Sequence, residues 1–196
     1  MNIPLALDYL PDKRAELDNN NLIAIGRLSK EKGFIDLIDV IKLLYEQKND
    51  IKLHIIGDGF EKQSIEQHIK ECNLEGVVIL HGFREKDYIR QILNDSSIYL
   101  MTSFTEAFPI VLMEAISFGL PIVAFNTNNG PLEIIEQGKN GFCIENRNKH
   151  EMADKVVMVL ENIELRNKMG KAAYDKSKIY SVENVRNIWI DFLKNI

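Results

Sequence analysis

The sequence predicts an α/β fold, a doubly wound and mostly parallel Rossmann-like sheet of six strands. Short apolar runs recur along the chain, each closes at a glycine or a polar loop, and most loops lead into a segment with helical apolar spacing. Strands that alternate with helices form parallel sheets covered on both faces. The predicted strands are residues 22–25, 51–56, 77–81, 98–101, 120–125 and 141–144.

Helical patterns fill the segments between these strands. The first of them is the best defined, because apolar residues recur from Phe34 to Tyr45 at three- and four-residue intervals with charged residues on the other side. Residues 149–195 lack strand patterns and predict helices in two or three pieces, separated near Asn162 and Ser181. The other predicted helices are residues 61–72, 86–93, 109–118 and a short one at 132–136.

The bulk composition excludes several classes of protein. The chain has 196 residues, of which 45% are hydrophobic and 27% charged, enough for one domain with a full core. A net charge of −5 does not favour a nucleic-acid binder. Two cysteines, Cys72 and Cys143, form neither a disulfide framework nor a metal-ligand spacing. The N-terminus has no signal-peptide pattern, so we expect a cytoplasmic protein.

The chain divides into a lead-in and a folded domain. Residues 1–20 contain proline, aspartate and asparagine and read as a linker, and the domain is expected over 21–180. In such sheets ligands bind outside the carboxyl ends of the strands. Charged, aromatic and glycine residues follow several of the predicted strands, so we expect them to meet at one rim: Arg27, Lys32, Gly57, Gly59, Phe83, Arg84 and Glu106.

Two carboxylates stand at the strand-to-helix junction after residues 98–101. Glu106 precedes the helix and Glu114 lies within it, among apolar neighbours where a carboxylate needs a partner or a ligand. Pro109 suits the first helical turn. The alternative is that both acids are ordinary helix residues matched to the dipole or to solvent. Free N–H groups of that turn would bind an anion, and they belong to Ile110, Val111 and Leu112.

Two cations border the glycine-flanked loop after the first strand. Arg27 and Lys32 could neutralise a diphosphate, although exposed loop charges are the simpler interpretation without further context. After the second strand, Gly57-Asp58-Gly59 begins like a dinucleotide fingerprint, but Lys62 stands where the third glycine belongs. The indication of a nicotinamide cofactor is therefore weak, and a tight turn explains the glycines equally well.

Taken together, these segments resemble one family. Glu106 and Glu114 match the Glu-x7-Glu motif of retaining GT-B glycosyltransferases of family 4, the glycosyl transferases group 1. The loop from Gly26 to Gly33 resembles the family's Gly-Arg-Leu-x-x-x-Lys-Gly pattern, and the segments 57–59 and 81–84 resemble two further family segments. The resemblance covers roughly residues 20–196 but only the C-terminal, donor-binding half of the family's architecture.

The resemblance implies a role for each matching residue. Arg27 and Lys32 would bind the donor's diphosphate and stabilise the leaving group, together with the amides of Ile110 and Val111. Glu106 would contact the donor sugar and Glu114 the ribose hydroxyls. The backbone at Gly26, Gly57 and Gly59 would approach the donor, and Phe83 and Arg84 would border the base. Ala107 and Pro109 replace frequent glycines, from which we expect an altered sugar preference.

The resemblance also implies partners. The donor is a nucleotide-diphosphate sugar, with a UDP-sugar expected, and no other cofactor is implied. No Asp-x-Asp pair appears in the sequence, so we expect metal-independent catalysis. The acceptor, a saccharide or a lipid-linked saccharide, would be reached through a missing N-terminal domain. Residues 130–141 resemble a segment of members that build bacterial surface polysaccharides.

The two ends of the chain resemble the family's interdomain region. Met1 to Pro4 resemble the end of the interdomain connection, and the helix 181–196 resembles one that packs toward the N-terminal domain. We therefore expect a half that is inactive alone, from a full-length protein that works at the inner face of the membrane. Two alternatives stay open, a sugar-nucleotide epimerase and a non-catalytic nucleotide-binding module.

Overall fold

All six expected strands form, and they pair in parallel in the order β3-β2-β1-β4-β5-β6. The computed structural model describes residues 5–106, 108–127 and 130–194. This order confirms the predicted doubly wound sheet, with the reversal between β1 and β4. The strands are β1 (Asn21–Ile25), β2 (Lys52–Ile56), β3 (Val78–Leu80), β4 (Ile98–Met101), β5 (Ile122–Phe125) and β6 (Gly141–Ile144).

The helices also follow the prediction, with changes at their ends. Asn162 separates two of them, as expected, and its side-chain oxygen accepts a hydrogen bond from Leu165 N at 2.9 Å. Pro109 lies one residue outside its helix as the N-cap, not within the first turn. The helices are α1 (Phe34–Gln47), α2 (Lys62–Glu71), α3 (Lys86–Asn94), α4 (Ile110–Ser117), α5 (Lys149–Glu161), α6 (Ile163–Ser177) and α7 (Val182–Lys194).

Within the described residues, four short 3₁₀ turns connect these elements. The expected short helix at residues 132–136 is one of them, because only Pro131–Glu133 close into a turn. The four are η1 (Lys30–Lys32), η2 (Pro131–Glu133), η3 (Glu145–Arg147) and η4 (Lys178–Tyr180). Two of them, η1 and η3, follow the carboxyl ends of β1 and β6 and so belong to the rim where a ligand is expected.

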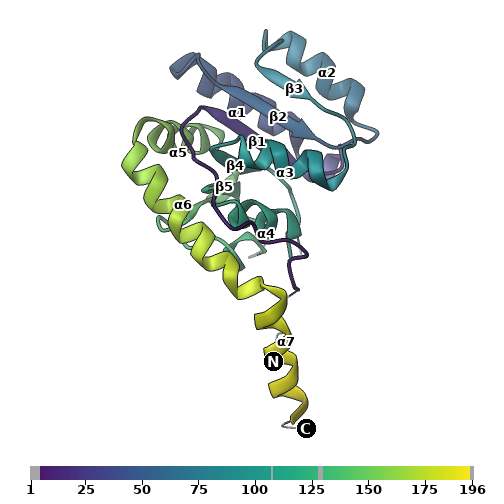
Figure 1. Ribbon diagram of the computed structural model, residues 1–196. Helices are drawn as coiled ribbons and strands as arrows, with labels where there is room; N and C mark the ends of the chain where they lie inside the picture. Colours follow the sequence, from purple (N-terminus) through teal and green to yellow (C-terminus); the bar gives the residue numbers. More distant parts are fainter. Residues whose placement is uncertain (1–4, 107, 128–129, 195–196) are drawn as a thin grey trace.

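Alternate residues of each strand face opposite layers. In β1, Leu22 joins the core formed with α1, α2 and α5, whereas Ile23 joins the core formed with α3 and α4. Helix α6 packs against both α4 and α5 (Figure 1). Because both faces of the sheet are covered, the strands read as apolar runs and not as an alternating pattern.

The described part of the lead-in packs on the domain. Leu7, Ala15 and Leu17 are buried in the core on the α4 side. The segment runs past α4 and α6 before it enters β1 (Figure 1, dark purple). Backbone hydrogen bonds hold it: Leu7 N donates to Tyr180 O at 2.8 Å, and Ala15 N donates to Phe118 O at 2.8 Å. The structure therefore adds a packing role to the segment expected as a linker.

At the other end, α7 extends away from the body of the domain (Figure 1). Several of its large apolar side chains are exposed, namely those of Val182, Trp189, Ile190 and Leu193. Within the part of the chain that the structure describes, no helix combines the length and the apolar character needed to cross a membrane.

The strands β1 and β4 separate soon after they meet. They pair only at Leu22 with Ile98 and at Ile23 with Tyr99. Beyond that point the Tyr99 side chain replaces the missing ladder: its hydroxyl accepts from Ile25 N and donates to Ile25 O, both at 3.1 Å. Burial raises the pKa of the Tyr99 hydroxyl far above its ordinary value, so it stays protonated and able to donate. One buried phenol thus satisfies the backbone of β1 where its ladder with β4 ends, and a small crevice lies between the two strand ends there.

Replacing Tyr99 by Phe should lower the free energy of unfolding by about 1–3 kcal/mol, because both backbone groups of Ile25 lose their partner. Urea denaturation of the two proteins measures the difference. The matched control is Tyr45→Phe on α1, a half-buried tyrosine whose change should stay within about 0.5 kcal/mol. Equal losses for both variants would contradict this role for Tyr99.

Candidate functional site

A lysine and a glutamate meet above the crevice between β1 and β4. Lys32 comes from η1, after β1, and Glu106 comes from the loop after β4. Lys32 Nζ lies 2.6 Å from Glu106 Oε1, and Ser103 Oγ donates to the same oxygen at 2.7 Å. The Glu106 side chain is only 11% exposed. Since the described residues supply no partner for Oε2, that oxygen remains available to a ligand.

Sequence reasoning missed the side chain that holds this loop in place. Arg147, in η3 after β6, donates to Ser103 O and Thr102 O, each at 2.8 Å. Its guanidinium also lies 3.6 Å from the centre of the Phe104 ring and 2.5 Å from an oxygen of Asp36. Arg147 follows a strand end, as the predicted rim residues do, and that position was its only signal in the sequence.

The second predicted cation is exposed. The Arg27 side chain is 68% exposed and pairs with Glu31, four residues on, at 3.1 Å. A surface pair of this kind contributes little to stability, so Arg27 can leave Glu31 for an anion at small cost. Arg27 and Lys32 lie in one loop. Lys32 forms an ion pair with Glu106 of another loop, whereas Arg27 pairs with Glu31 of the same loop.

The two predicted glycines after β2 have a structural reason. A Cβ on Gly57, with φ 145°, would lie 1.9 Å from Gly26 O, and one on Gly59, with φ 158°, would lie 2.4 Å from Leu28 O. The loops after β1 and β2 therefore touch backbone to backbone. Leu28 N also donates to Asp58 O at 2.9 Å. Contact of these glycines with a donor stays a prediction.

Phe83 and Arg84 lie after β3, at the outer edge of the sheet. The Phe83 side chain is 70% exposed, and the Arg84 guanidinium lies 5.0 Å from the centre of the Tyr88 ring. Behind them, Tyr88 Oη and His81 Nδ1 are 2.9 Å apart, and His81 Nε2 is 2.9 Å from His54 Nδ1. Burial lowers the pKa of both histidines, which favours the neutral rings that such a chain of hydrogen bonds requires.

The Glu114 carboxyl differs from that of Glu106 because no described residue donates a hydrogen bond to it, although Ser117 Oγ donates to the backbone carbonyl of Glu114. It lines a small pocket between α3, α4 and the lead-in, together with Asp8, Tyr9, Lys86 and Arg90. Burial raises the pKa of the Glu114 carboxyl, the Asp8 carboxylate adds to the rise, and Lys86 and Arg90 oppose it. Among the described residues, the predicted need of Glu114 for a partner is met only by the nearby charges of Lys86 and Arg90 and not by a hydrogen bond to its carboxyl.

Glu106 and Glu114 both lie close enough to the Tyr99 hydroxyl for their charges to affect it. Burial is the largest cause of the raised pKa of Tyr99, and the charges of both Glu114 and Glu106 add to it. The Tyr99 hydroxyl is bonded to Ile25, the last residue of β1. Both acids therefore lie near the ends of β1 and β4, one on the η1 side of the crevice and one on the α4 side.

The start of α4 offers fewer free amides than the sequence suggested. Leu112 N donates to Pro109 O at 2.9 Å, so the expectation that this amide is free is wrong. The amides of Ile110 and Val111 donate to no backbone carbonyl of residues 5–106 and 108–127. Gly130 packs against the same loop, since a Cβ there would lie 2.3 Å from Glu106 O. The expected effect of Ala107 lies outside the described residues, as do Met1 to Pro4.

Replacing Glu114 by Gln should raise the melting temperature near neutral pH. Because its pKa is raised above the ordinary value of 4.5, the ionised carboxylate destabilises the folded state. That penalty is present above the raised pKa and disappears as the pH falls below 4.5. Melting curves across this pH range should therefore show a gap between variant and parent that closes on acidification.

Glu66→Gln, at an exposed position of α2, is the matched control and should show no such gap. A gap for Glu114→Gln that widens in acid would contradict the assignment of the penalty to this carboxylate.

Comparison with known proteins places this geometry in a family. The family model for glycosyl transferases group 1 matches residues 9–176. An uncharacterised glycosyltransferase of Haemophilus influenzae is 33% identical over 91% of the chain and 50% of its own length. The poly(ribitol-phosphate) alpha-N-acetylglucosaminyltransferase of Staphylococcus aureus is 33% identical over 87% and 34%. The amylovoran biosynthesis glycosyltransferase AmsD of Erwinia amylovora is 32% identical over 89% and 48%.

Solved structures of glycosyltransferases share the fold of this chain. A mutant of S. aureus TarM, in complex with fondaparinux, alpha-GlcNAc-glycerol and UDP, superposes with a TM-score of 0.83 at 31% identity over 97% of this chain and 37% of that one. The C-terminal domain of a group 1 glycosyl transferase (LpcC) of Francisella tularensis has the same fold, with a TM-score of 0.76 at 24% identity over 89% of this chain and 96% of that one.

The chain spans half or less of the length of these three curated relatives, and what it matches is the C-terminal half of the two-domain GT-B architecture. Together with the six-stranded parallel sheet, this shows that the chain belongs to the glycosyl transferases group 1 family and is a C-terminal domain of that family.

Proposed function

We propose that this domain binds the UDP-sugar donor of a retaining glycosyltransferase. The observation that carries the proposal is the pair of Lys32 and Glu106 at 2.6 Å, directly above the point where β1 and β4 separate. Doubly wound sheets bind nucleotides at such a point. The similar S. aureus structure that contains UDP supports the choice of nucleotide.

The diphosphate of the donor would lie between the loop after β1 and the start of α4. Arg27 and Lys32 supply positive charge there, and the amides of Ile110 and Val111 supply donors at a helix N-terminus. Glycosyl transfer leaves a nucleoside diphosphate, on which negative charge grows as the bond to the sugar breaks. Fixed cations and amides stabilise that charge in the transition state more than in the bound donor.

Glu106 would orient the donor sugar. Its Oε1 accepts hydrogen bonds from Lys32 and Ser103. Its Oε2 would then accept a hydrogen bond from a hydroxyl of the sugar. Arg147 keeps the loop in that position through two backbone carbonyls. Since the acid is already bound to a lysine, we assign it a positioning role and not that of a nucleophile. Pro109, which replaces a frequent glycine, would tune the choice of sugar.

Glu114 would bind the ribose, because a carboxylate accepts hydrogen bonds from two vicinal hydroxyls. Binding would give this acid the partners that it lacks in the domain alone, so part of its raised pKa would be relieved in the complex. Phe83 and Arg84, at the outer end of the rim, would border the base.

Catalysis would need no metal ion. The groups of His, Cys, Asp and Glu close enough to share an ion, within the described residues, do not include Glu106 or Glu114. Arg27, Lys32 and the α4 amides would supply the positive charge that a divalent ion supplies to other phosphate-binding sites.

The rest of the enzyme would supply the acceptor. A saccharide or a lipid-linked saccharide would enter from an N-terminal domain that this chain does not include. The exposed apolar side chains of α7, with Trp189 and Leu193 among them, suit packing against that domain. Relatives that act on poly(ribitol phosphate) and in amylovoran biosynthesis favour a role in bacterial surface polysaccharide synthesis, in the cytoplasm at the inner face of the membrane.

Removing either cation should weaken UDP binding. Arg27→Ala and Lys32→Ala each delete one charge-assisted phosphate contact, so each should cost about 1.5–3 kcal/mol of binding free energy. Calorimetric titration of the chain with UDP measures the loss. The matched control is Lys30→Ala, an exposed lysine of the same loop, which should bind UDP as the parent does.

Equal losses for all three lysine and arginine variants would point to a diffuse charge effect and contradict a defined diphosphate site. The titration repeated in EDTA should give the same affinity, and a loss there would contradict metal independence.

The chain alone should transfer no sugar, because we expect the acceptor to bind to an N-terminal domain of the full-length protein. Incubation with a UDP-sugar and a panel of saccharide acceptors, analysed by mass spectrometry, should give no glycoside, whereas the full-length protein should give one. A glycoside made by this chain alone would refute the expectation. Free nucleotide released without a glycoside would instead favour the epimerase alternative.

A further inference from the structure

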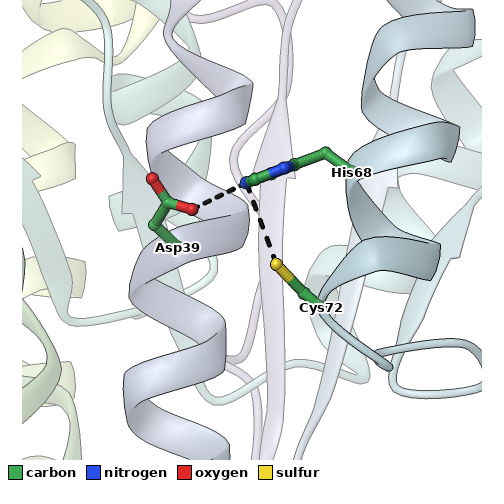
Figure 2. Close-up of side chains that lie close together, drawn as sticks. All are labelled: Asp39, His68 and Cys72. Atoms are coloured by element: carbon green, nitrogen blue, oxygen red, sulfur yellow. Dashed lines mark hydrogen bonds and ion pairs between the residues drawn. The ribbon is translucent and has the colours of Figure 1, made fainter.

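Away from the rim, α1 and α2 bring together a histidine, a cysteine and an aspartate. His68 Nε2 lies 2.6 Å from Asp39 Oδ1 and 3.8 Å from Cys72 Sγ. Figure 2 shows Asp39 on α1, His68 on α2 and Cys72 at the C-cap of α2, with all three side chains turned toward one point. The three ligand atoms all lie within 4.8 Å of one another, and all three residues are partly exposed.

We propose that Asp39, His68 and Cys72 bind a zinc ion that ties α2 to α1. A thiolate, an imidazole and a carboxylate form a donor set that zinc prefers, and water would occupy the fourth position of a tetrahedron. The partial exposure of the cluster gives the ion and that water a path from solvent. This site is separate from the donor-binding rim and does not rest on the proposed function.

The observed spacing is close to what a tetrahedral ion needs. Usual zinc bond lengths place a nitrogen and a sulfur ligand about 3.6 Å apart, and a nitrogen and an oxygen ligand about 3.4 Å apart. The first separation is 3.8 Å here. The second is 2.6 Å, a hydrogen bond that has to open by less than about 1 Å when the ion enters. Cys72 is the C-cap of α2 and keeps a right-handed helical backbone, so its side chain and that of His68, four residues earlier, lie on the same side.

Lys149 and Glu71 contact two of the three proposed ligands from the side away from the metal position. Lys149 Nζ lies 2.7 Å from Asp39 Oδ2, which leaves Oδ1 to the ion. Glu71 Oε2 lies 3.7 Å from His68 Nδ1, and Gln67 donates to Glu71 Oε1 at 2.9 Å. A carboxylate behind a ligating histidine fixes its ring and raises its basicity.

Zinc binding would exchange one proton for the metal. Burial raises the pKa of the Cys72 thiol, and the charges of Asp39 and Glu71 add to the rise while Lys42 opposes it. The free site therefore holds a thiol. When zinc binds, the sulfur–hydrogen bond of Cys72 breaks, a sulfur–zinc bond forms and the thiol proton passes to solvent. The hydrogen that His68 Nε2 donates to Asp39 has to move to Nδ1, on the side of Glu71, so that Nε2 can bind the metal.

The ion would act on stability. Asp39 shares Lys149 with Asp36, and Asp36 binds Arg147, the clamp of the Glu106 loop. Zinc at one hundred times its dissociation constant should raise the ratio of folded to unfolded protein about a hundredfold, less any binding to the unfolded chain. Denaturation with and without zinc chloride measures this ratio.

The decisive experiment titrates the metal-free chain with zinc chloride and, in parallel, with cobalt chloride. We expect one zinc per chain and a sulfur-to-cobalt charge-transfer band, which only a thiolate ligand produces. Cys72→Ser keeps the shape of the side chain, and it should abolish the band and weaken zinc binding at least about a hundredfold. His68→Ala should do the same, and Glu71→Gln should cost about tenfold.

His150→Ala, an exposed histidine on α5, is the matched control and should bind zinc as the parent does. Circular dichroism confirms that each variant is folded. Absence of zinc binding by the parent, or binding that survives both Cys72→Ser and His68→Ala, would overturn the proposal. UDP titration of the same variants should be unchanged, so that failure of the zinc site and failure of the donor site are read separately.

Discussion

The site depends on the early separation of two parallel strands. After Ile23 and Tyr99 the ladder between β1 and β4 ends, because the chain leaves the two strands toward opposite faces of the sheet. The open backbone at Ile25 would be costly if it were left unpaired, and the Tyr99 hydroxyl satisfies both of its groups. A crevice at the end of the strands, with loops on either side, follows from this geometry.

The two acids at the crevice differ in how their charge is balanced. Lys32 and Glu106 neutralise each other in the free domain, and the loop that carries the acid is fixed by Arg147. The Glu114 carboxyl stays half-buried, no described residue donates a hydrogen bond to it, and burial raises its pKa. The pair of Lys32 and Glu106 is stable without a ligand. The buried charge of Glu114 destabilises the folded domain, and hydrogen bonds from a polyhydroxylated ligand would reduce that effect. Functional sites often keep such destabilising groups.

Ion pairs connect the cluster of Asp39, His68 and Cys72 with the loop that carries Glu106. The chain of contacts from His68 to Asp39, Lys149, Asp36 and Arg147 runs across the α1 side of the molecule and ends at the loop before Glu106. These side chains are partly exposed, so each pair alone contributes modestly. As a network they fix the positions of α2, α5 and the rim loop relative to α1.

Local patterns in the sequence were enough to predict the strands, the helices and the edge of the sheet at which polar residues gather. Apolar runs such as Ile98 to Met101 and breaks such as Asn162 are local signals, and parallel strands place their ends at one edge without further information. The roles of Arg27, Lys32 and Glu114 toward a donor came from family resemblance, since an exposed arginine and a helical glutamate carry no distinctive pattern of their own.

The contacts between side chains could not be predicted from local patterns in the sequence. Sequence separation conceals that Lys32 binds Glu106, that Arg147 holds Ser103, and that Asp39 lies beside His68. It also conceals that Leu112 N is already bonded and that Gly57 is needed for the contact of two loops. These facts depend on the packing of helices against a shared sheet, and that packing sums weak contacts over the whole domain, so no short stretch of sequence encodes it.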